Sequence, residues 1–293
     1  MRAVLLGTAA GGGLPQWNCA CANCEAVRDG SAPPRTQDCV AVSADGRAWY
    51  LLNASQDIHT QLASHSALRP GPGPRETPLQ GVLLTDGELD HTLGLFSLKE
   101  AAGLRVWAPD AIAATVPARE IAARYHDWEW PRLEAKFELD GLSVTVLPVS
   151  DKRPKYAVES TLDGPWVVAY RIEDRATGGS LVYAPCVAQW PAGFDEFCAG
   201  AGCVVLDGSF FAPDEMTGAT AGGIGSHAQL AMGHVPMAGE YGSLARIRRS
   251  RATRWLYTHV NNTNPVLNPA SPEYAALLGA GAELPPDATE LFL

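Results

Sequence analysis

Short apolar runs separated by turn residues recur along the first half of the chain, with helix-like patterns between them. The runs are rich in branched residues and end at Gly, Asp or Pro, as buried strands do. Two runs within 40–54 are joined by an Asp-Gly turn, which predicts a hairpin. Further strands are expected at 3–6, 81–84 and 105–108, and helices at 57–68, 92–96 and 110–125.

The pattern begins again near residue 140, so the second half resembles a partial repeat of the first. Alternating strands and helices indicate an α/β chain with one large or two fused domains. The segment 149–164 is polar and aperiodic, which fits either a flap over a site or a plain surface insertion. Strands are expected at 142–148, 166–173, 180–184 and 204–206, a helix at 238–249 and a last strand from Trp255.

The composition narrows the possible partners. The chain has 293 residues, of which 46% are hydrophobic, so it can bury a large core and is not disordered. Its net charge is −10 with only 22 Lys and Arg, which argues against nucleic acid and anionic membranes. The one basic run, 246–254 with five arginines, is expected to be a solvated helix face. No apolar stretch is long enough to insert into and span a membrane.

Cysteine usage indicates a reducing, cytoplasmic setting. The chain has seven cysteines, and three of them, Cys19, Cys21 and Cys24, are close enough in sequence to face one tetrahedral cation. This spacing predicts a structural zinc site in place of a disulfide framework. The fourth ligand has to come from elsewhere, and Asn262 and His234 are the candidates. The alternative is three buried thiols that bind no metal.

The strongest candidate for chemistry is the loop that follows the strand at 81–84. It carries Asp86, Glu88, Asp90 and His91. Carboxylates so close together repel one another unless a cation, protons or hydrogen-bond donors neutralise them. The neighbouring imidazole completes a set of ligands suited to iron or zinc. The alternative is a solvated acidic turn with a surface histidine.

Three later residues stand at strand ends or helix entrances. Asp207 ends a strand, His234 precedes the helical segment, and His259 ends the last strand. Each fits an ordinary capping role, but together with the acidic loop they converge on one site. The glycine-rich loop 7–18 lacks the full pattern of a phosphate-binding or dinucleotide-binding loop. Its glycines are therefore expected to let the backbone pass close to the site.

Four motifs stand out in the chain. They are Gly-Thr-Ala-Ala-Gly-Gly-Gly-Leu-Pro-Gln-Trp-Asn-Cys-x-Cys-x-x-Cys, Thr-Asp-Gly-x-Leu-Asp-His-Thr-Leu-Gly-Leu, Gly-His-x-Pro-Met and Thr-His-x-Asn-Asn-Thr-Asn-Pro. They resemble motifs of the coenzyme PQQ synthesis protein B family, within the metallo-β-lactamase superfamily. The resemblance runs from Gly7 to Pro265. It implies a single α+β domain over 1–293, an αββα four-layer sandwich, with two similar halves (about 1–140 and 141–293).

The superfamily's His-x-His-x-Asp-His pattern falls on the acidic loop, with carboxylates in place of its first two histidines. The resemblance therefore implies one metal, held by Asp90, His91 and His259. The superfamily's middle histidine is missing, and its bridging aspartate would fall at Pro185 or Cys186. These departures argue against a dinuclear zinc hydrolase, which holds its nucleophile between two cations.

Two imidazoles and one carboxylate with open positions are the ligand set of non-haem Fe(II) oxygenases, although they also accept other divalent metals. The resemblance implies a role in making pyrroloquinoline quinone (PQQ) from a Glu-Tyr unit of a precursor peptide. Hydroxylation of the tyrosine ring with O2 fits an iron site. Asp86 and Glu88 are assigned as acids or extra ligands, and Asp207 and His234 as residues that position protons.

Two other functions fit the resemblance. One is a metal-dependent hydrolase of a pathway intermediate, with His234 as proton donor. The other is a carrier that moves PQQ or its precursor out of the cytoplasm. In every case the partner is a small peptide or an amino-acid-derived precursor, and a homo-oligomer is compatible with the sequence.

Overall fold

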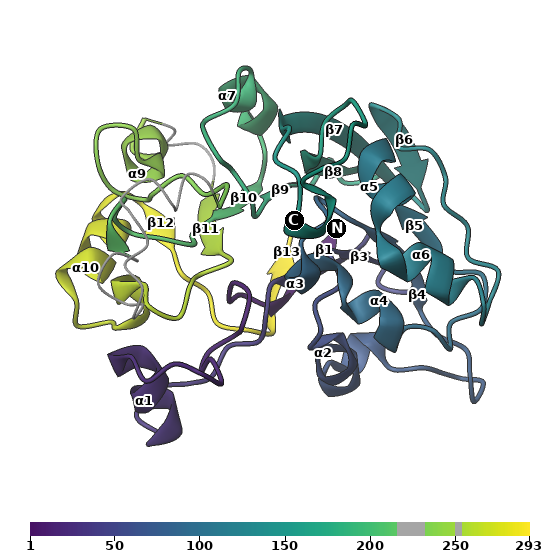
Figure 1. Cartoon of the computed structure of the whole chain (residues 1–293), viewed down its shortest axis with the longest axis horizontal. Helices are drawn as coiled ribbons and strands as arrows, with labels where there is room; N and C mark the ends of the chain where they lie inside the picture. The colour runs from purple at the N-terminus through teal and green to yellow at the C-terminus, as the bar shows by residue number, and fades with distance from the viewer. Residues whose placement is uncertain (216–231, 250–253) are drawn as a thin grey trace.

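Two mixed β-sheets form the centre of the protein in the computed structural model, which describes residues 1–215, 232–249 and 254–293 (Figure 1). The first sheet contains β1 (Arg2–Gly7), β2 (Cys39–Ser43), β3 (Trp49–Leu52), β4 (Leu79–Leu83), β5 (Arg105–Trp107) and β13 (Thr289–Phe292). The second contains β6 (Lys136–Leu139), β7 (Leu142–Ser150), β8 (Val167–Asp174), β9 (Ser180–Ala184), β10 (Cys203–Asp207), β11 (Arg254–Thr258) and β12 (Ala282–Glu283).

The strand order brings the ends of three strands to one place. The orders are β13-β1-β2-β3-β4-β5 and β12-β11-β10-β9-β8-β7-β6. Strand β4 is parallel to both its neighbours, and β9, β10 and β11 are parallel to one another. The carboxyl ends of β4, β10 and β11 therefore lie at one edge of the two sheets, where sheet proteins commonly build sites. Strand β13 returns to β1, so the two termini are neighbours (Figure 1).

Helices cover the outer faces of both sheets. Residues of α2, α4, α5 and α6 share one apolar cluster with the first sheet, and residues of α7, α9 and α10 share another with the second. A third cluster fills the space between the sheets. The helices are α1 (Ala22–Arg28), α2 (Ile58–Ser64), α3 (Leu89–Thr92), α4 (Gly94–Ser97), α5 (Asp110–Thr115), α6 (Pro117–Ala122), α7 (Phe194–Cys198), α9 (Ser243–Ile247) and α10 (Pro272–Gly279).

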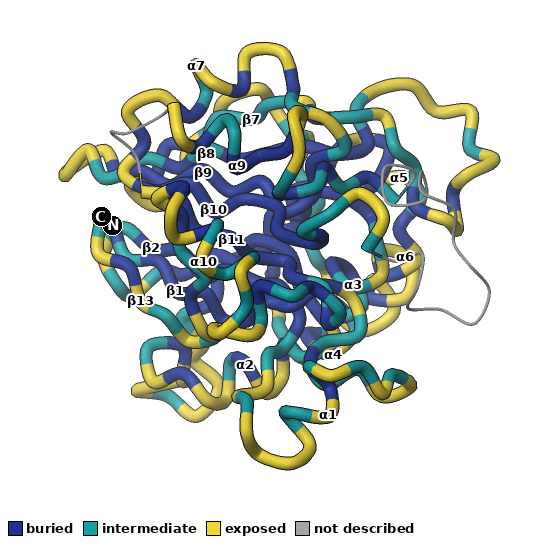
Figure 2. The backbone as a smooth tube through the Cα atoms, turned by 90° about the vertical axis from the view of Figure 1, so that its left-hand side faces the viewer, coloured by how far each residue is buried: buried dark blue, intermediate teal, exposed yellow. Residues whose placement is uncertain are grey.

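Alternation along the strands produces these layers. In β1, Ala3 and Leu5 face the layer between the sheets, whereas Val4 and Leu6 face the helices. Successive side chains of a strand point to opposite faces, so a strand with helices on one side and a sheet on the other is apolar throughout. Figure 2 shows the result, buried strands enclosed by exposed connections. The predicted αββα architecture is confirmed, whereas the division into halves near residue 140 stays a prediction.

Three predicted helices are shorter than expected. The pattern at 110–125 forms two helices, because Pro117 lacks an N–H and holds Val116 in an extended conformation. The expected helix at 238–249 begins only at Ser243, after a turn that includes Gly239, whose φ is +93°. The pattern at 57–68 gives α2 and then a separate 3-10 turn at Ser66–Leu68. Other 3-10 turns are Lys155–Ala157 and Pro265–Leu267.

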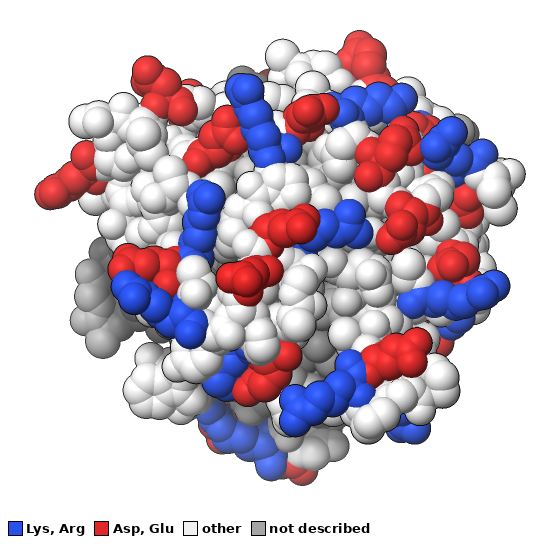
Figure 3. Space-filling view, turned by 90° about the vertical axis from the view of Figure 1, so that its right-hand side faces the viewer, with Lys and Arg blue, Asp and Glu red and all other residues white. Residues whose placement is uncertain are grey.

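The face shown in Figure 3 has no obvious binding surface for a polyanion. Acidic and basic side chains are interspersed there, without a continuous basic patch. The arginine run at 246–254 lies partly outside the described residues, and only Arg246 of its arginines stands within α9. No helix in the described part of the chain is both long and apolar enough to cross a membrane.

Candidate metal centre

The side chains of Asp90, His91 and His259 meet at the edge where β4 and β11 end. Asp90 and His91 lie in the short helix α3, and His259 follows β11 directly. Asp90 Oδ2 is 3.1 Å from His259 Nε2 and 3.9 Å from His91 Nε2. His259 has a φ of +54°, uncommon for a residue other than glycine and typical of functional positions. The structure thus brings together the three residues predicted to hold the active-site metal.

Hydrogen bonds to the far side of each imidazole determine which nitrogen faces this cluster. His91 Nδ1 lies 2.8 Å from Asp86 Oδ2, and His259 Nδ1 lies 2.8 Å from Ser209 Oγ. His91 Nδ1 carries the donated proton, since a carboxylate can only accept. His259 Nδ1 does so too, because the Ser209 hydroxyl gives its own proton to Asp207. In the neutral form of each ring, the Nε2 atom therefore presents a lone pair towards Asp90. His91 Nε2 is buried and has no hydrogen-bond partner among the described residues.

Three electron-rich groups that converge in this way need a positive charge between them. Burial would lower the pKa of His91, but Asp86 and Asp90 outweigh it and raise that pKa to about 10. Burial would raise the pKa of Asp90, yet His91 and His259 hold it below its usual range. The site therefore favours protons or a cation, and a metal ion would displace the protons. The donor set and the unpartnered Nε2 fit a divalent metal.

A second group of polar side chains adjoins the first through Ser209. The Ser209 hydroxyl donates to Asp207 Oδ1 at 2.8 Å and accepts from the Nδ1 atoms of His259 and His234. His234 Nδ1 also lies 2.8 Å from Asp207 Oδ2. Asp207 is fully buried at the end of β10, while His234 lines the adjoining cavity. Asp207 and His234 thus lie together as predicted. Because Asp207 contacts Nδ1, the Nε2 atom of His234 is available to a ligand in the cavity.

Sequence reasoning missed Ser209 and the carboxylate beneath the histidines, Asp38. Asp38 is fully buried and accepts hydrogen bonds from the hydroxyls of Tyr183 and Thr258. Burial raises the pKa of Asp38, although His259 and His91 favour its charged form. The only signals in the sequence were a polar residue at the start of a strand and a Ser two residues after Asp207, both ordinary features.

Glycines let the chain approach this cluster closely. A Cβ on Gly11 would lie 3.0 Å from Asp90 Oδ2, so the glycine-rich loop passes the site as expected. A Cβ on Gly87 would lie 2.6 Å from the Tyr156 hydroxyl. Gly87 therefore allows the segment 149–164 to pack on the acidic loop. The segment therefore covers the site, as the flap interpretation requires, and that it moves stays a prediction.

The cluster opens into a cavity of about 570 Å³. Glu88 lies in its wall and pairs with Lys152, with Oε1 and Nζ 2.6 Å apart. Cys186 also lines it, at one of the positions where the superfamily's bridging aspartate would fall. The lining residues are Ala10, Gly11, Glu88, Asp90, His91, Lys152, Arg153, Lys155, Val158, Cys186, Ser209, Met232, His234, His259 and Asn261.

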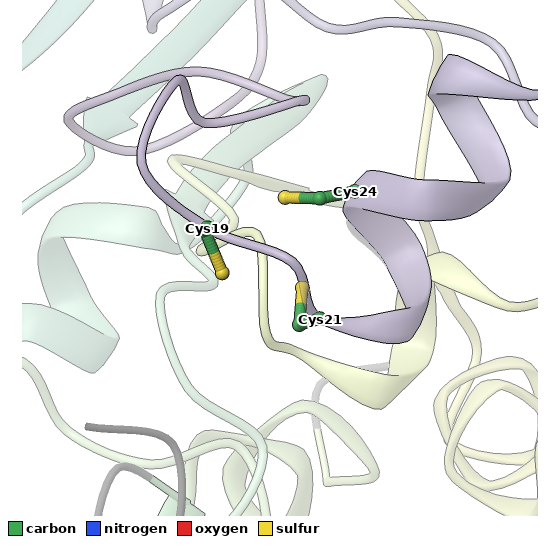
Figure 4. Close-up of side chains that lie close together, drawn as sticks. All are labelled: Cys19, Cys21 and Cys24. Carbon is green, nitrogen blue, oxygen red and sulfur yellow. The ribbon is translucent and has the colours of Figure 1, made fainter. Parts of the chain in front are cut away.

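The three clustered cysteines form a separate group beside Asn262. Figure 4 shows Cys24 on α1 and Cys19 and Cys21 on the loop before it, with their sulfurs close together. The three Sγ atoms lie within 4.8 Å of one another, as zinc ligands would. Asn262 Nδ2 is 3.1 Å from Cys19 Sγ and 3.3 Å from Cys24 Sγ. His234, the other candidate for fourth ligand, lies with Asp207 instead.

In this arrangement Asn262 donates N–H to the sulfurs, which stabilises thiolate charge. To act as the fourth ligand, its amide would have to turn and offer the carbonyl oxygen. The three cysteine sulfurs fit three ligands of a structural zinc ion. The carbonyl oxygen of Asn262 remains the candidate for the fourth ligand.

Comparison with known proteins agrees with this geometry. A family model described as the beta-lactamase superfamily domain matches residues 48–260. The coenzyme PQQ synthesis protein B of Pseudomonas fluorescens is 36% identical over 302 residues, with 99% of each chain covered. That of Methylobacterium nodulans is 39% identical over 304 residues, with the whole of both chains covered. The chain belongs to the coenzyme PQQ synthesis protein B family.

Two solved structures resemble this member of the coenzyme PQQ synthesis protein B family, and one of them contains zinc. The crystal structure of Zn²⁺-bound PqqB from Methylobacterium extorquens superposes with a TM-score of 0.90, at 35% identity and full coverage of both chains. A diphosphatase of the PhnP family superposes with a TM-score of 0.70 at 19% identity, which is a likeness of fold alone. Zinc binding is thus shown for a relative in the same family.

Proposed function

We propose that this chain acts in PQQ biosynthesis as an Fe(II)-dependent, O2-using hydroxylase of the tyrosine ring of a Glu-Tyr unit. The observation that carries the proposal is the convergence of two imidazole Nε2 atoms and the Asp90 carboxylate at an open cavity. Such a set of two histidines and one carboxylate leaves positions for O2 and substrate. The family name supplies the pathway.

When bound at Asp90, His91 and His259, iron supplies one-electron chemistry with O2 that zinc lacks. The overall reaction places one oxygen atom of O2 in a ring C–H bond, and the other leaves as water. Its balance takes two electrons and two protons from a reductant outside the protein. A catechol is the product.

The protein's own residues supply orientation and a proton acceptor. Asp86 and Ser209 hold His91 and His259 with their Nε2 atoms towards the metal position. Asp207 holds His234 in the same way, so that its Nε2 can take the phenol proton of the substrate as a general base. The Glu88 carboxylate pairs with Lys152 in the cavity wall and is not among the ligand atoms that converge at Asp90, His91 and His259.

Metal exchange tests this proposal. The protein is stripped of metal, reloaded anaerobically with Fe(II), Zn(II) or Mn(II), and mixed with Glu-Tyr and a reductant. We expect O2 uptake and a catechol only with Fe(II), and neither with a His91→Ala variant that retains its fold. Full activity in iron-free protein, or turnover without O2, would contradict the proposal.

The same assay separates the two alternatives. A hydrolase would release a new amine or acid end from a peptide substrate with zinc bound and without O2. A carrier of PQQ or its precursor would bind its ligand and leave it unchanged. We also propose a cytoplasmic location, because all seven cysteines are free thiols. The precursor peptide and O2 as partners, and a possible homo-oligomer, stay predictions.

A further inference from the structure

The cavity beside the metal position has one wall of cations in a protein whose net charge is −10. Lys152, Arg153 and Lys155 line it, all from the segment that packs over the acidic loop. Lys152 is already paired with Glu88. Arg153 and Lys155 form no ion pair with any carboxylate in the described part of the chain.

Arg153 is held in place by stacking. Its Cζ lies 5.5 Å from the centroid of the Trp166 ring, and Trp166 is 1% exposed. A guanidinium stacked on a fixed aromatic face is pre-organised and keeps its N–H groups free at the edge. Arg153 Nε is buried and has no hydrogen-bond partner among the described residues. A buried donor without a partner costs free energy, so its presence beside a cavity indicates a ligand.

The two carboxylates that line the cavity do not pair with Arg153 or Lys155. Glu88 is neutralised by Lys152, and Asp90 faces His91 and His259 at the metal position. The cavity thus has a metal side and a cationic side. A ligand that fits both sides carries an oxidisable ring at one end and an anion at the other.

We propose that Arg153, with Lys155 beside it, determines specificity by binding a carboxylate of the substrate while the aromatic ring faces Asp90, His91 and His259. The inference rests on the proposed function, because a Glu-Tyr unit carries both groups. Carboxylate and guanidinium form paired parallel hydrogen bonds that lysine cannot reproduce. Arg153 would therefore fix the position of the ring and add to affinity more than to the rate of the chemical step.

Direct binding to the full-length protein loaded with Zn(II) tests this inference without requiring turnover. Calorimetric titrations use Glu-Tyr, Gln-Tyr, Glu-tyrosinamide and the doubly amidated Gln-tyrosinamide. We expect Arg153→Met to weaken Glu-Tyr binding by about 10- to 100-fold, the worth of a charge-assisted pair. We expect it to change Gln-tyrosinamide binding little. The singly amidated ligand that loses affinity for the wild type identifies the carboxylate bound.

Arg246→Met is the matched control, since Arg246 also stacks on a tryptophan, with Cζ 5.9 Å from the Trp190 ring, but does not line the cavity. It should bind all four ligands as the wild type does. Arg153→Lys keeps the charge and should give intermediate affinity, which also covers the case in which Arg153→Met fails to fold.

Four results would overturn the inference. They are unchanged Glu-Tyr binding in both Arg153 variants, equal loss for the doubly amidated ligand, no measurable Glu-Tyr binding by the wild type, or inorganic phosphate binding as tightly as Glu-Tyr. If the expected binding pattern is found but the iron-loaded protein takes up no O2, the proposed hydroxylation fails and the role of Arg153 stands.

Discussion

Asp86 accepts a hydrogen bond from His91 Nδ1 at 2.8 Å, while the opposite nitrogen of the same ring is buried without a described hydrogen-bond partner. Asp86 itself is held by the hydroxyl of Thr85 and the backbone N–H of Glu88. Burial would raise the pKa of Asp86, but His91 lowers it to about 2, so the carboxylate is charged. The ring is thus fixed in the orientation that a metal ligand needs.

Replacing Asp86 by Asn should lower the affinity of the active site for Fe(II) or Zn(II) by about 10- to 100-fold, because the support of His91 is lost. Competition with a chelator measures this change. Glu88→Gln is the control, since Glu88 pairs with Lys152 and not with a ligand. A larger loss from Glu88→Gln than from Asp86→Asn would mean that Glu88, and not Asp86, serves the metal.

A methyl group on Gly11 should displace Asp90, because the added Cβ would lie 3.0 Å from Asp90 Oδ2. We expect Gly11→Ala to reduce kcat/KM by about tenfold or more, as small misplacements at active sites do. Gly279→Ala is the control, since a Cβ there meets no atom within 4 Å. Equal activities of the two variants would show that Asp90 is not held by this close approach.

Removal of the Ser209 hydroxyl should disturb two imidazoles at once, since it accepts from both His234 and His259. We expect Ser209→Ala to lower kcat by about 10- to 100-fold, the usual range for groups that orient a metal-binding histidine. Ser243→Ala removes a hydroxyl that lies 2.6 Å from the Tyr257 hydroxyl and does not line the cavity. It should cost about 1 kcal/mol of stability and leave kcat unchanged. If Ser209→Ala affects only stability, the link between the imidazoles has no catalytic role.

The cysteine group and the histidine group should be separable by mutation. Cys21→Ser should lower zinc content and the midpoint of thermal unfolding, with little direct effect on the chemistry. His91→Ala should abolish activity while the zinc at the cysteines is retained. Elemental analysis, thermal unfolding and O2 uptake on both variants decide this. The reverse pattern would mean that the roles of the two sites have been exchanged.

The sequence predicts most of the strands because they are short, branched and bounded by turn residues, whereas the αββα arrangement is predicted by the family resemblance. Its strand ends also predict that the acidic loop and His259 converge on one site, since such ends meet at a sheet edge. The family resemblance is what singles out Asp90, His91 and His259 as the ligands. The helices are less well predicted. The break between α5 and α6 is predictable, because a proline ends the helix before it. The late start of α9 at Ser243 is not, because it depends on how the preceding turn packs on Met237 and Ala238.

The remaining parts of the site depend on contacts between distant segments, which one sequence does not display. Ser209 gains its role only when β10 and β11 bring Asp207 and His259 side by side. Asp38 is one of many polar residues near a strand, and its importance follows from burial against Tyr183 and Thr258. Arg153 is notable only because Trp166 lies behind it.

Isotope labelling tests the central claim most directly. Iron-loaded protein is given Glu-Tyr and a reductant under oxygen-18 gas in ordinary water, and the product is examined by mass spectrometry. We predict that the new ring hydroxyl carries one oxygen-18 atom, and that ordinary O2 in oxygen-18 water leaves it unlabelled. A product that forms without O2, or one whose new oxygen comes from water, would contradict the account.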